Sequence, residues 1–409
     1  MSEPVYLIAT MDSKGHEIDF VSQVLQRGGV ESVMVDVGTL AAPQVTPHVN
    51  RDDILHCIGK SSADLPADRG EAIGVMGKAL AAFLRMRWDR GQMGGVLGVG
   101  GSGGTALIAE GLRALPIGFP KVLVSTVASG NTAPYVDCCD IMMMFSVVDI
   151  AGLNAVSRPI LANAANAIAG MVRGEKPSPT PKPTIGMTMF GVTTPCVDRV
   201  RQALTDRGYD CLVFHATGTG GRAMEQLVES GLIQGVLDIT TTEVADEIVG
   251  GVFPAGSRRF DRLLQAKIPL VLSLGAVDMV NFGGLASVPE RFKDRTLHVH
   301  NSNVTLMRTN REENRAIAEW IARKLNQATA PWSLLIPAQG VSLLDQPGQP
   351  FHDPEADQVL FERLEESIEP ASNRRIVRLP YHVNDPAFSA ALVDEFLRLA
   401  ATHAVTDAG

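Results

Sequence analysis

Residues 95–105, GVLGVGGSGGT, decide the fold. The first six form an apolar run typical of a buried strand, and the apolar spacing that follows predicts a helix over 106–112. The glycines let backbone N–H groups approach an anion, and the N-terminus of the helix adds a favourable partial charge. This order of strand, turn and helix predicts a β-α-β protein that binds phosphate at the turn. The alternative is a turn whose glycines serve only close packing of the helix on the strand.

Two known phosphate motifs are each incomplete in this turn. It satisfies G-x-G-x-x-G, but the acidic residue expected about 20 residues later to hold a ribose is missing, which disfavours ordinary NAD binding. It also approaches the P-loop pattern, with Thr105 at the hydroxyl position that contacts Mg²⁺ but Gly104 in place of the lysine. A cation must therefore come from elsewhere, and Lys14, at the end of the first predicted strand, is the best candidate.

The alternation of short apolar runs with helical patterns extends over the whole chain. Strands are predicted over 5–11, 32–37, 95–100, 121–127, 141–148, 185–190, 211–215, 235–239, 269–274, 298–306, 332–337 and 375–379. Longer helices are predicted over 74–86, 151–172, 312–325, 356–366 and 387–400. We therefore expect an α/β protein of two Rossmann-like, doubly wound parallel-sheet lobes, with a ligand cleft between them.

A proline-rich linker is expected between the two lobes. Residues 174–183 read GEKPSPTPKP, and their alternate prolines prevent a helix and remove N–H donors from a strand. The sequence thus predicts a nucleotide-binding lobe at 1–175 and a second α/β lobe, with the substrate site, at 184–409.

Composition disfavours several kinds of partner. The 409 residues include 36 Lys plus Arg and 45 Asp plus Glu, and the net charge of −9 disfavours nucleic acid and anionic membranes. The longest apolar run, 141–148, is far below the ~20 residues of a membrane span and is expected to be a buried strand. Five cysteines without a C-x-x-C pair predict neither a disulfide framework nor a zinc ribbon. Reduced thiols and the lack of a leader pattern indicate a cytoplasmic protein.

Further hydrogen-bond donors follow the fourth predicted strand, at the same sheet edge as the glycine-rich turn. They are Ser125, Thr126, Ser129, Gly130 and Asn131. The alternative is an ordinary polar turn, since neighbouring strand ends converge only if the strand order allows it.

The second lobe has polar residues at its own strand ends. Residues 215–222, HATGTGGR, resemble a second anion loop, in which Arg222 can clamp a phosphate or carboxylate. Glu243 and Asp278 follow two further strands. The alternative here is helix capping, because a threonine such as Thr242 is more often a cap than a catalyst.

Two histidines and an arginine complete the candidates of the second lobe. His298 and His300 are expected on one face of a single strand, with Arg308 downstream. Two histidines alone do not define a metal site, so no metal ligands are predicted.

Nine strings in the chain resemble one known family. Among them are ATMDSKGHE, GVGGSGGTALI, VSTVASGNTAPYV, FHATGTGGRAME, DITTTEVADEIVGG and HNSNVTLMRT, in this order. The family is a widespread uncharacterised one of bacteria and fungi, whose plant member is an inhibitor of viral RNA replication. The resemblance implies an ATP-binding, two-lobed α/β protein that self-associates, as a homodimer or larger homo-oligomer. The nucleotide candidates carried over by motif are Thr10, Asp12, Ser13, Lys14, Gly100, Gly101, Ser102, Gly103, Gly104, Thr105, Ser125, Thr126, Ser129, Gly130 and Asn131.

These observations favour an ATP-binding protein that uses ATP, with Mg²⁺, on a small anionic metabolite in the cleft. The catalytic groups expected in the second lobe are Arg222, Glu243, Asp278, His300 and Arg308. One alternative is a regulatory module that binds the nucleotide without turnover. Another is a nucleotide-independent hydrolase or lyase that uses the region of His298 and His300.

Overall fold

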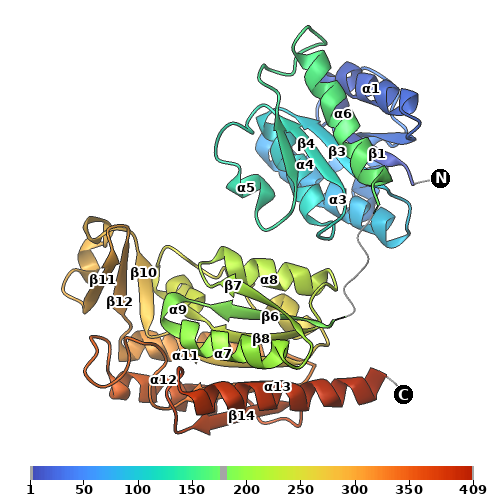
Figure 1. Cartoon of the computed structure of the whole chain (residues 1–409). Helices are drawn as coiled ribbons and strands as arrows, with labels where there is room; N and C mark the ends of the chain where they lie inside the picture. Colours follow the sequence, from blue (N-terminus) through green and yellow to red (C-terminus); the bar gives the residue numbers. More distant parts are fainter. Residues whose placement is uncertain (1–2, 176–181, 408–409) are drawn as a thin grey trace. The chain divides into compact units, whose positions relative to one another are not determined.

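The computed structural model describes residues 3–175 and 182–407. The chain divides into two compact units, Met1–Ser178 and Pro179–Gly409 (Figure 1). Most of the expected linker, residues 176–181, lies outside the described residues. The expected cleft between the lobes therefore stays a prediction.

Lobe one, the N-terminal unit, contains a five-stranded parallel sheet in the order β2-β1-β3-β4-β5. The strands are β1 Val5–Ala9, β2 Ser32–Asp36, β3 Gly95–Gly100, β4 Lys121–Ser125 and β5 Met142–Phe145. This is the flavodoxin-like variant of the doubly wound fold, in which the chain reverses its direction of winding between β1 and β3.

Helices cover both faces of this sheet because each central strand is apolar on both sides. In β1, Leu7 packs with α1 and α6, whereas Ile8 packs with α3 and α4, as the alternation of side chains along a strand requires. Figure 1 shows α1 beside α6. The helices are α1 Met11–Arg27, α2 Arg51–Leu55, α3 Arg69–Asp89, α4 Ser102–Arg113, α5 Ala133–Val136 and α6 Ser157–Arg173.

Lobe two repeats this plan with six parallel strands in the order β14-β13-β9-β8-β6-β7. These strands are β6 Thr184–Met189, β7 Asp210–His215, β8 Gly235–Thr240, β9 Leu270–Gly275, β13 Trp332–Pro337 and β14 Arg374–Leu379. One face carries α7 Thr194–Thr205 and α13 Pro386–Asp407. The other carries α8 Thr219–Glu229, α9 Thr242–Val249, α10 Asp261–Gln265, α11 Arg311–Leu325 and α12 Pro354–Ser367. Both lobes are thus doubly wound, as the sequence predicts.

A separate antiparallel sheet in lobe two corrects one prediction. The single strand expected over 298–306 is a hairpin of β11 Leu297–Asn301 and β12 Val304–Arg308, and β12 also pairs with β10 Met279–Phe282. The chain turns at Asn303, whose backbone N–H donates to the side chain of Asn301 at 2.8 Å. Such short polar side chains stabilise turns by bonding to nearby backbone.

Strand β5 also differs from its prediction as a buried strand. It lies at the edge of the lobe-one sheet, and Met142 and Phe145 are 39% and 38% exposed. Within the described residues, no helix is both long and apolar enough to cross a membrane.

Candidate functional site

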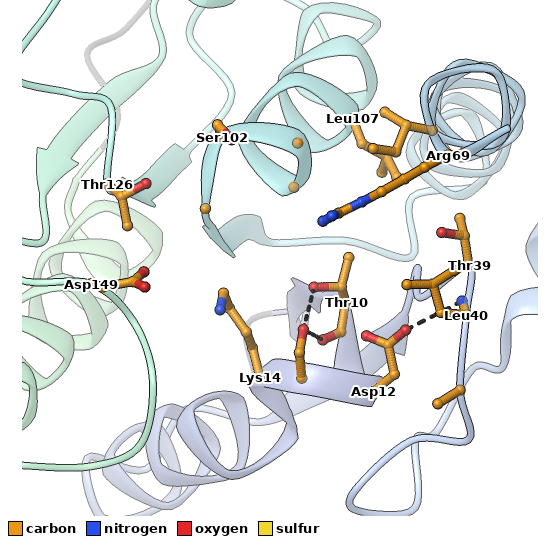
Figure 2. A pocket seen from close by; sticks show the side chains of 16 residues that line it. Thr10, Asp12, Lys14, Thr39, Leu40, Arg69, Ser102, Leu107, Thr126 and Asp149 are labelled. Atoms are coloured by element: carbon orange, nitrogen blue, oxygen red, sulfur yellow. Dashed lines mark hydrogen bonds between the residues drawn. The ribbon is translucent and has the colours of Figure 1, made fainter.

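The carboxyl edge of the lobe-one sheet contains a pocket of about 450 Å³ (Figure 2). Helix α1 follows β1 on one face of the sheet and α4 follows β3 on the other, so a crevice opens between these neighbouring strand ends. The pocket is lined by Thr10, Asp12, Ser13, Lys14, Thr39, Leu40, Ala41, Arg69, Ile73, Gly101, Ser102, Gly103, Gly104, Leu107, Thr126 and Asp149.

The glycines of the turn fall into two groups. A Cβ atom on Gly98 would lie 2.5 Å from Ile108 Cγ2, and one on Gly100 would lie 2.6 Å from a backbone nitrogen, so these two serve close packing. A Cβ on Gly101 or Gly104 would meet nothing within 4 Å, and both residues line the pocket. Packing therefore explains only part of the glycine-rich turn, and the rest keeps the pocket wall open at the start of α4.

Two cationic side chains reach into this pocket. Lys14 lies in the first turns of α1, at a local kink, and its Nζ donates to the backbone oxygen of Ile150 at 2.6 Å. Arg69 is the first residue of α3. Figure 2 shows the two side chains reaching toward the middle of the pocket from different sides. The amide groups of the first turn of α4 add partial positive charge, since they have no acceptor within the helix.

Carboxylates and hydroxyls complete the polar wall. Asp12 accepts a hydrogen bond from the backbone N–H of Leu40 at 3.3 Å, which ties the loop after β2 to the start of α1. Asp149 follows β5 and is exposed. The hydroxyls of Thr10 and Ser13 lie 3.2 Å apart. The site thus combines cations with carboxylates around a cradle of amide groups.

Nine of the fifteen predicted nucleotide residues line the pocket: Thr10, Asp12, Ser13, Lys14, Gly101, Ser102, Gly103, Gly104 and Thr126. Gly100, Thr105 and Ser125 lie beneath it, and the last two are fully buried. Ser129, Gly130 and Asn131 are exposed in the turn after β4 and do not line it.

Thr105, which the sequence places at the hydroxyl position of an incomplete P-loop and among the nucleotide residues, does not line the pocket. Its hydroxyl lies 2.6 Å from the hydroxyl of Ser125 and also donates to the backbone oxygen of Gly100 at 3.3 Å. Both hydroxyls are therefore used to join the ends of β3 and β4, and neither faces the pocket.

Sequence reasoning missed several lining residues. They are Thr39, Leu40, Ala41, Arg69, Ile73, Leu107 and Asp149. Asp149 follows a strand and the rule used for the other strand ends could have found it. Arg69 starts a helix that does not follow a strand, so no local signal marked it.

The predicted second anion loop, residues 215–222, is occupied by the carboxylate of Glu243. Glu243 Oε1 accepts the backbone N–H groups of Gly218 at 2.8 Å and Gly221 at 3.2 Å. Glu243 is 0% exposed. The loop is thus filled by an internal carboxylate, which contradicts its prediction as a ligand site and that of Glu243 as a catalytic group. Arg222 is exposed on α8, and its Nε donates to the backbone oxygen of Gly218.

Arg259 binds the other oxygen of Glu243 within a buried ionic cluster. Its guanidinium lies 3.0 Å from Glu243, 2.9 Å from Glu225 and 2.8 Å from Asp238. Burial raises the pKa of Glu225 and of Asp238, and Arg259 opposes that rise. The cluster fixes α8, β8 and α9 against one another.

The remaining lobe-two candidates do not form one open site. Asp278 and Arg308 are 1% and 5% exposed and lie together in a second buried cluster. His300 is exposed on β11, and the ring of His298 packs 6.3 Å from that of Phe351. Thr242 is not a cap, because α9 is preceded by Thr241 and no side chain caps it. Within 3–175 and 182–407, no group of three or more His, Cys, Asp or Glu is arranged to hold a metal ion.

Fold and pocket together define a two-lobed, doubly wound α/β protein with a polar pocket at the switch point of its first lobe. The chain belongs to the uncharacterised protein family UPF0261. The N-terminal domain of that family matches residues 3–177, and its C-terminal domain matches 182–400.

Three relatives illustrate the range of the family. A UPF0261 protein of Mesorhizobium japonicum is 51% identical over 398 residues, which cover 97% of this chain and 99% of the relative. The ToMV resistance protein Tm-1 of Solanum lycopersicum is 47% identical over 421 residues, which cover 97% of this chain and 56% of that protein. The ToMV susceptible protein of the same plant is 46% identical. Because these two names are opposite and the identities nearly equal, the similarity carries no antiviral property to this chain.

Proposed function

We propose that lobe one binds ATP in the pocket at the end of β1 and β3. The observation that carries the proposal is the open wall at Gly101 and Gly104, which faces the same pocket as Lys14 and Arg69. Triphosphates require such a cradle of amide groups together with fixed cations.

The apolar part of the pocket wall suits the base of a nucleotide. Leu40, Ile73 and Leu107 supply apolar surface for a base. Figure 2 shows Leu40 on the side of Arg69, and Thr126 and Asp149 on the side of Lys14. We therefore infer that the base lies toward α3 and the phosphate tail toward Lys14.

Mg²⁺ fits this arrangement through Asp12 or Asp149. Protein-bound Mg²⁺ commonly takes one or two carboxylates and completes its shell with phosphate oxygens and water. The metal would neutralise charge on the phosphates, and Lys14 and Arg69 would orient them.

We further propose that the protein uses ATP in a reaction with a small anionic metabolite. The groups near a reacting phosphate are then those of the pocket wall, Lys14, Arg69, Asp12 and Asp149, rather than the buried groups of lobe two. Nucleotide binding without turnover is the alternative. The homo-oligomer and the cytoplasmic location stay predictions.

Calorimetric titration with ATP and Mg²⁺ tests the binding proposal on Gly101→Val. The φ of Gly101 is −74°, which valine can adopt, and its Cβ meets open space, so the variant is expected to fold. The branched side chain fills the cradle, and binding should be lost. Gly170→Val is the matched control, because Gly170 also faces open space but lies on α6 outside the pocket. A folded Gly101→Val protein that binds ATP as tightly as the control contradicts the proposal.

A further inference from the structure

A long ordered loop, residues 338–353, covers the carboxyl ends of strands in lobe two. It joins β13 to α12 without a helix or strand of its own, and loops of this length inside a compact domain are uncommon and usually functional. The N–H of Leu343 donates to the backbone oxygen of Val192, after β6, and the oxygen of Val341 accepts from Ala276, after β9. Phe351 is buried with Met279 and Leu306. The loop therefore closes over the sheet edge at which doubly wound proteins hold ligands.

Three buried carboxylates lie where this loop meets the rest of lobe two. Asp345 of the loop, Asp278 after β9 and Asp357 of α12 are 0%, 1% and 4% exposed. The loop is tied to Asp278 by Ser342, whose hydroxyl donates to Oδ2 at 2.7 Å. Asp345 holds its own loop through the N–H of Val341 at 2.9 Å.

A single guanidinium faces this acidic cluster. Arg308 lies 2.6 Å from Asp357 but 3.8 Å from Asp345. Arg308 also donates to the backbone oxygen of Phe351 at 2.7 Å and to that of Asp353 at 3.2 Å. It therefore binds the C-terminal end of the loop. Three ionised carboxylates and one arginine would leave a net charge of −2 on four residues that are each at most 5% exposed.

Electrostatics therefore requires the cluster to hold protons. Oδ1 of Asp278 and Oδ1 of Asp345 are buried and have no hydrogen-bond partner among the described residues. Burial, then repulsion from Asp345, raises the pKa of Asp278 to about 7. Burial raises the pKa of Asp357 to about 8, although Arg308 opposes this rise.

Four other titratable side chains lie near the loop. His352 Nδ1 lies 3.9 Å from Asp345 Oδ1, and its side chain is 34% exposed. His382 Nε2 lies 2.8 Å from the backbone oxygen of Ser342, and its Nδ1 accepts the backbone N–H of Asn384 at 3.1 Å. The carboxylate of Asp353 caps α12, and His298 packs on Phe351.

We propose that Asp278, Asp345 and Asp357 form a proton-dependent latch, which holds the loop 338–353 closed over lobe two and releases it as the pH rises. The latch residues lie in lobe two, outside the proposed nucleotide pocket of lobe one. A test of the latch is therefore independent of whether lobe one binds ATP.

The direction of the effect follows from the raised pKa values. Opening the loop exposes the carboxyls of Asp278 and Asp357 to water and returns their pKa values toward the ordinary value of about 3.9. Closure is then most stable below that value, weakens as the pH rises, and stops weakening above about pH 8, where Asp357 is ionised in both states. Between these limits the opening equilibrium should rise by about tenfold per pH unit for each proton released.

Hydrogen exchange of the full chain at pH 5, 6, 7 and 8 tests the latch, with each rate divided by its intrinsic rate at that pH. The amides of Val341, Leu343 and Phe351 should lose protection steeply over this range, whereas those of β8 Gly235–Thr240 should not. In Asp345→Asn, which replaces one carboxyl of the cluster by an amide of the same shape, the loop amides should change far less with pH. The control Asp394→Asn removes an exposed carboxylate of α13 and should behave as the wild type.

Three results would overturn the latch. They are protection of the loop that does not change with pH, an equal loss of protection in β8, and a pH dependence that Asp345→Asn leaves intact. If Asp345→Asn does not fold, Asp357→Asn provides the same comparison, and the wild-type pH series decides alone if neither folds.

Discussion

Glu243 accepts the backbone N–H of Gly218 at 2.8 Å from within the fold, so the glycine-rich loop of lobe two is closed by the protein's own carboxylate. The corresponding kind of loop in lobe one is open at Gly101 and Gly104. The two loops look alike in sequence because both need glycines for tight turns. They differ in what fills the space that the glycines leave. In lobe two it is the carboxylate of Glu243, whereas a Cβ atom on Gly101 or Gly104 in lobe one would meet no described atom within 4 Å.

The first prediction concerns Arg259, which balances this internal carboxylate. Arg259→Met leaves Glu225, Asp238 and Glu243 buried without a cation and should lower the free energy of unfolding of lobe two by about 3–5 kcal/mol. Urea unfolding followed by fluorescence measures it, since Trp320 and Trp332 both lie in lobe two. Arg262→Met is the control, because its pair with Glu229 is exposed and should contribute no more than about 1 kcal/mol. Equal stability of the two variants would contradict the structural role of Arg259.

The positions of the strands could be predicted from the sequence because each is a short apolar run bounded by glycine, proline or polar residues. Strand β3 is found with its predicted bounds, and most others differ by one or two residues. The hairpin at Asn301 could not be separated from one long strand, since no glycine or proline interrupts residues 297–308 and the turn is only two residues long.

The residues of the candidate site could likewise be predicted from the sequence only in part. Lys14 and Gly101 could be found because they follow strands, and parallel strands end at one edge of a sheet. The roles of Glu243 and Thr105 could not, because a strand-end polar residue can face the ligand or the interior, and only tertiary packing decides which. Arg69 comes from a helix whose position depends on the packing of α3 against α4.

The second prediction tests the buried position of Thr105. Thr105→Val removes the hydroxyl that joins Ser125 and should cost about 1–3 kcal/mol of stability, since Ser125 loses a buried partner. The dependence of ATP affinity on Mg²⁺ should not change. Thr126→Val provides the comparison, because Thr126 lines the pocket and is partly exposed. Loss of the Mg²⁺ dependence in Thr105→Val at unchanged stability would show instead that Thr105 contacts the metal.

The third prediction separates the two kinds of glycine. Gly104→Ala adds a methyl group to a helical position in open space, so stability should stay equal or rise by up to about 1 kcal/mol. ATP affinity should nevertheless fall, because the methyl group enters the phosphate cradle. Gly98→Ala should instead lower the melting temperature, since its Cβ would lie 2.5 Å from Ile108. Thermal unfolding and calorimetry on both variants measure the two effects, and an undiminished ATP affinity in Gly104→Ala would place the phosphates elsewhere.

The last prediction assigns the phosphate tail to Lys14. Lys14→Ala removes a positive charge from the side of the pocket that faces Asp149, whereas the base and the first phosphate are expected nearer α3 and the start of α4 (Figure 2). A hydrogen bond to a charged group contributes about 1.5–3 kcal/mol, so ATP affinity should fall by roughly 10- to 100-fold. AMP affinity should change by less than about twofold, because AMP lacks the groups that Lys14 contacts. Lys78→Ala, which removes an exposed lysine of α3 that does not line the pocket, should leave both affinities unchanged. Calorimetric titrations with both nucleotides measure the ratio, and equal losses for ATP and AMP would show that Lys14 acts away from the tail.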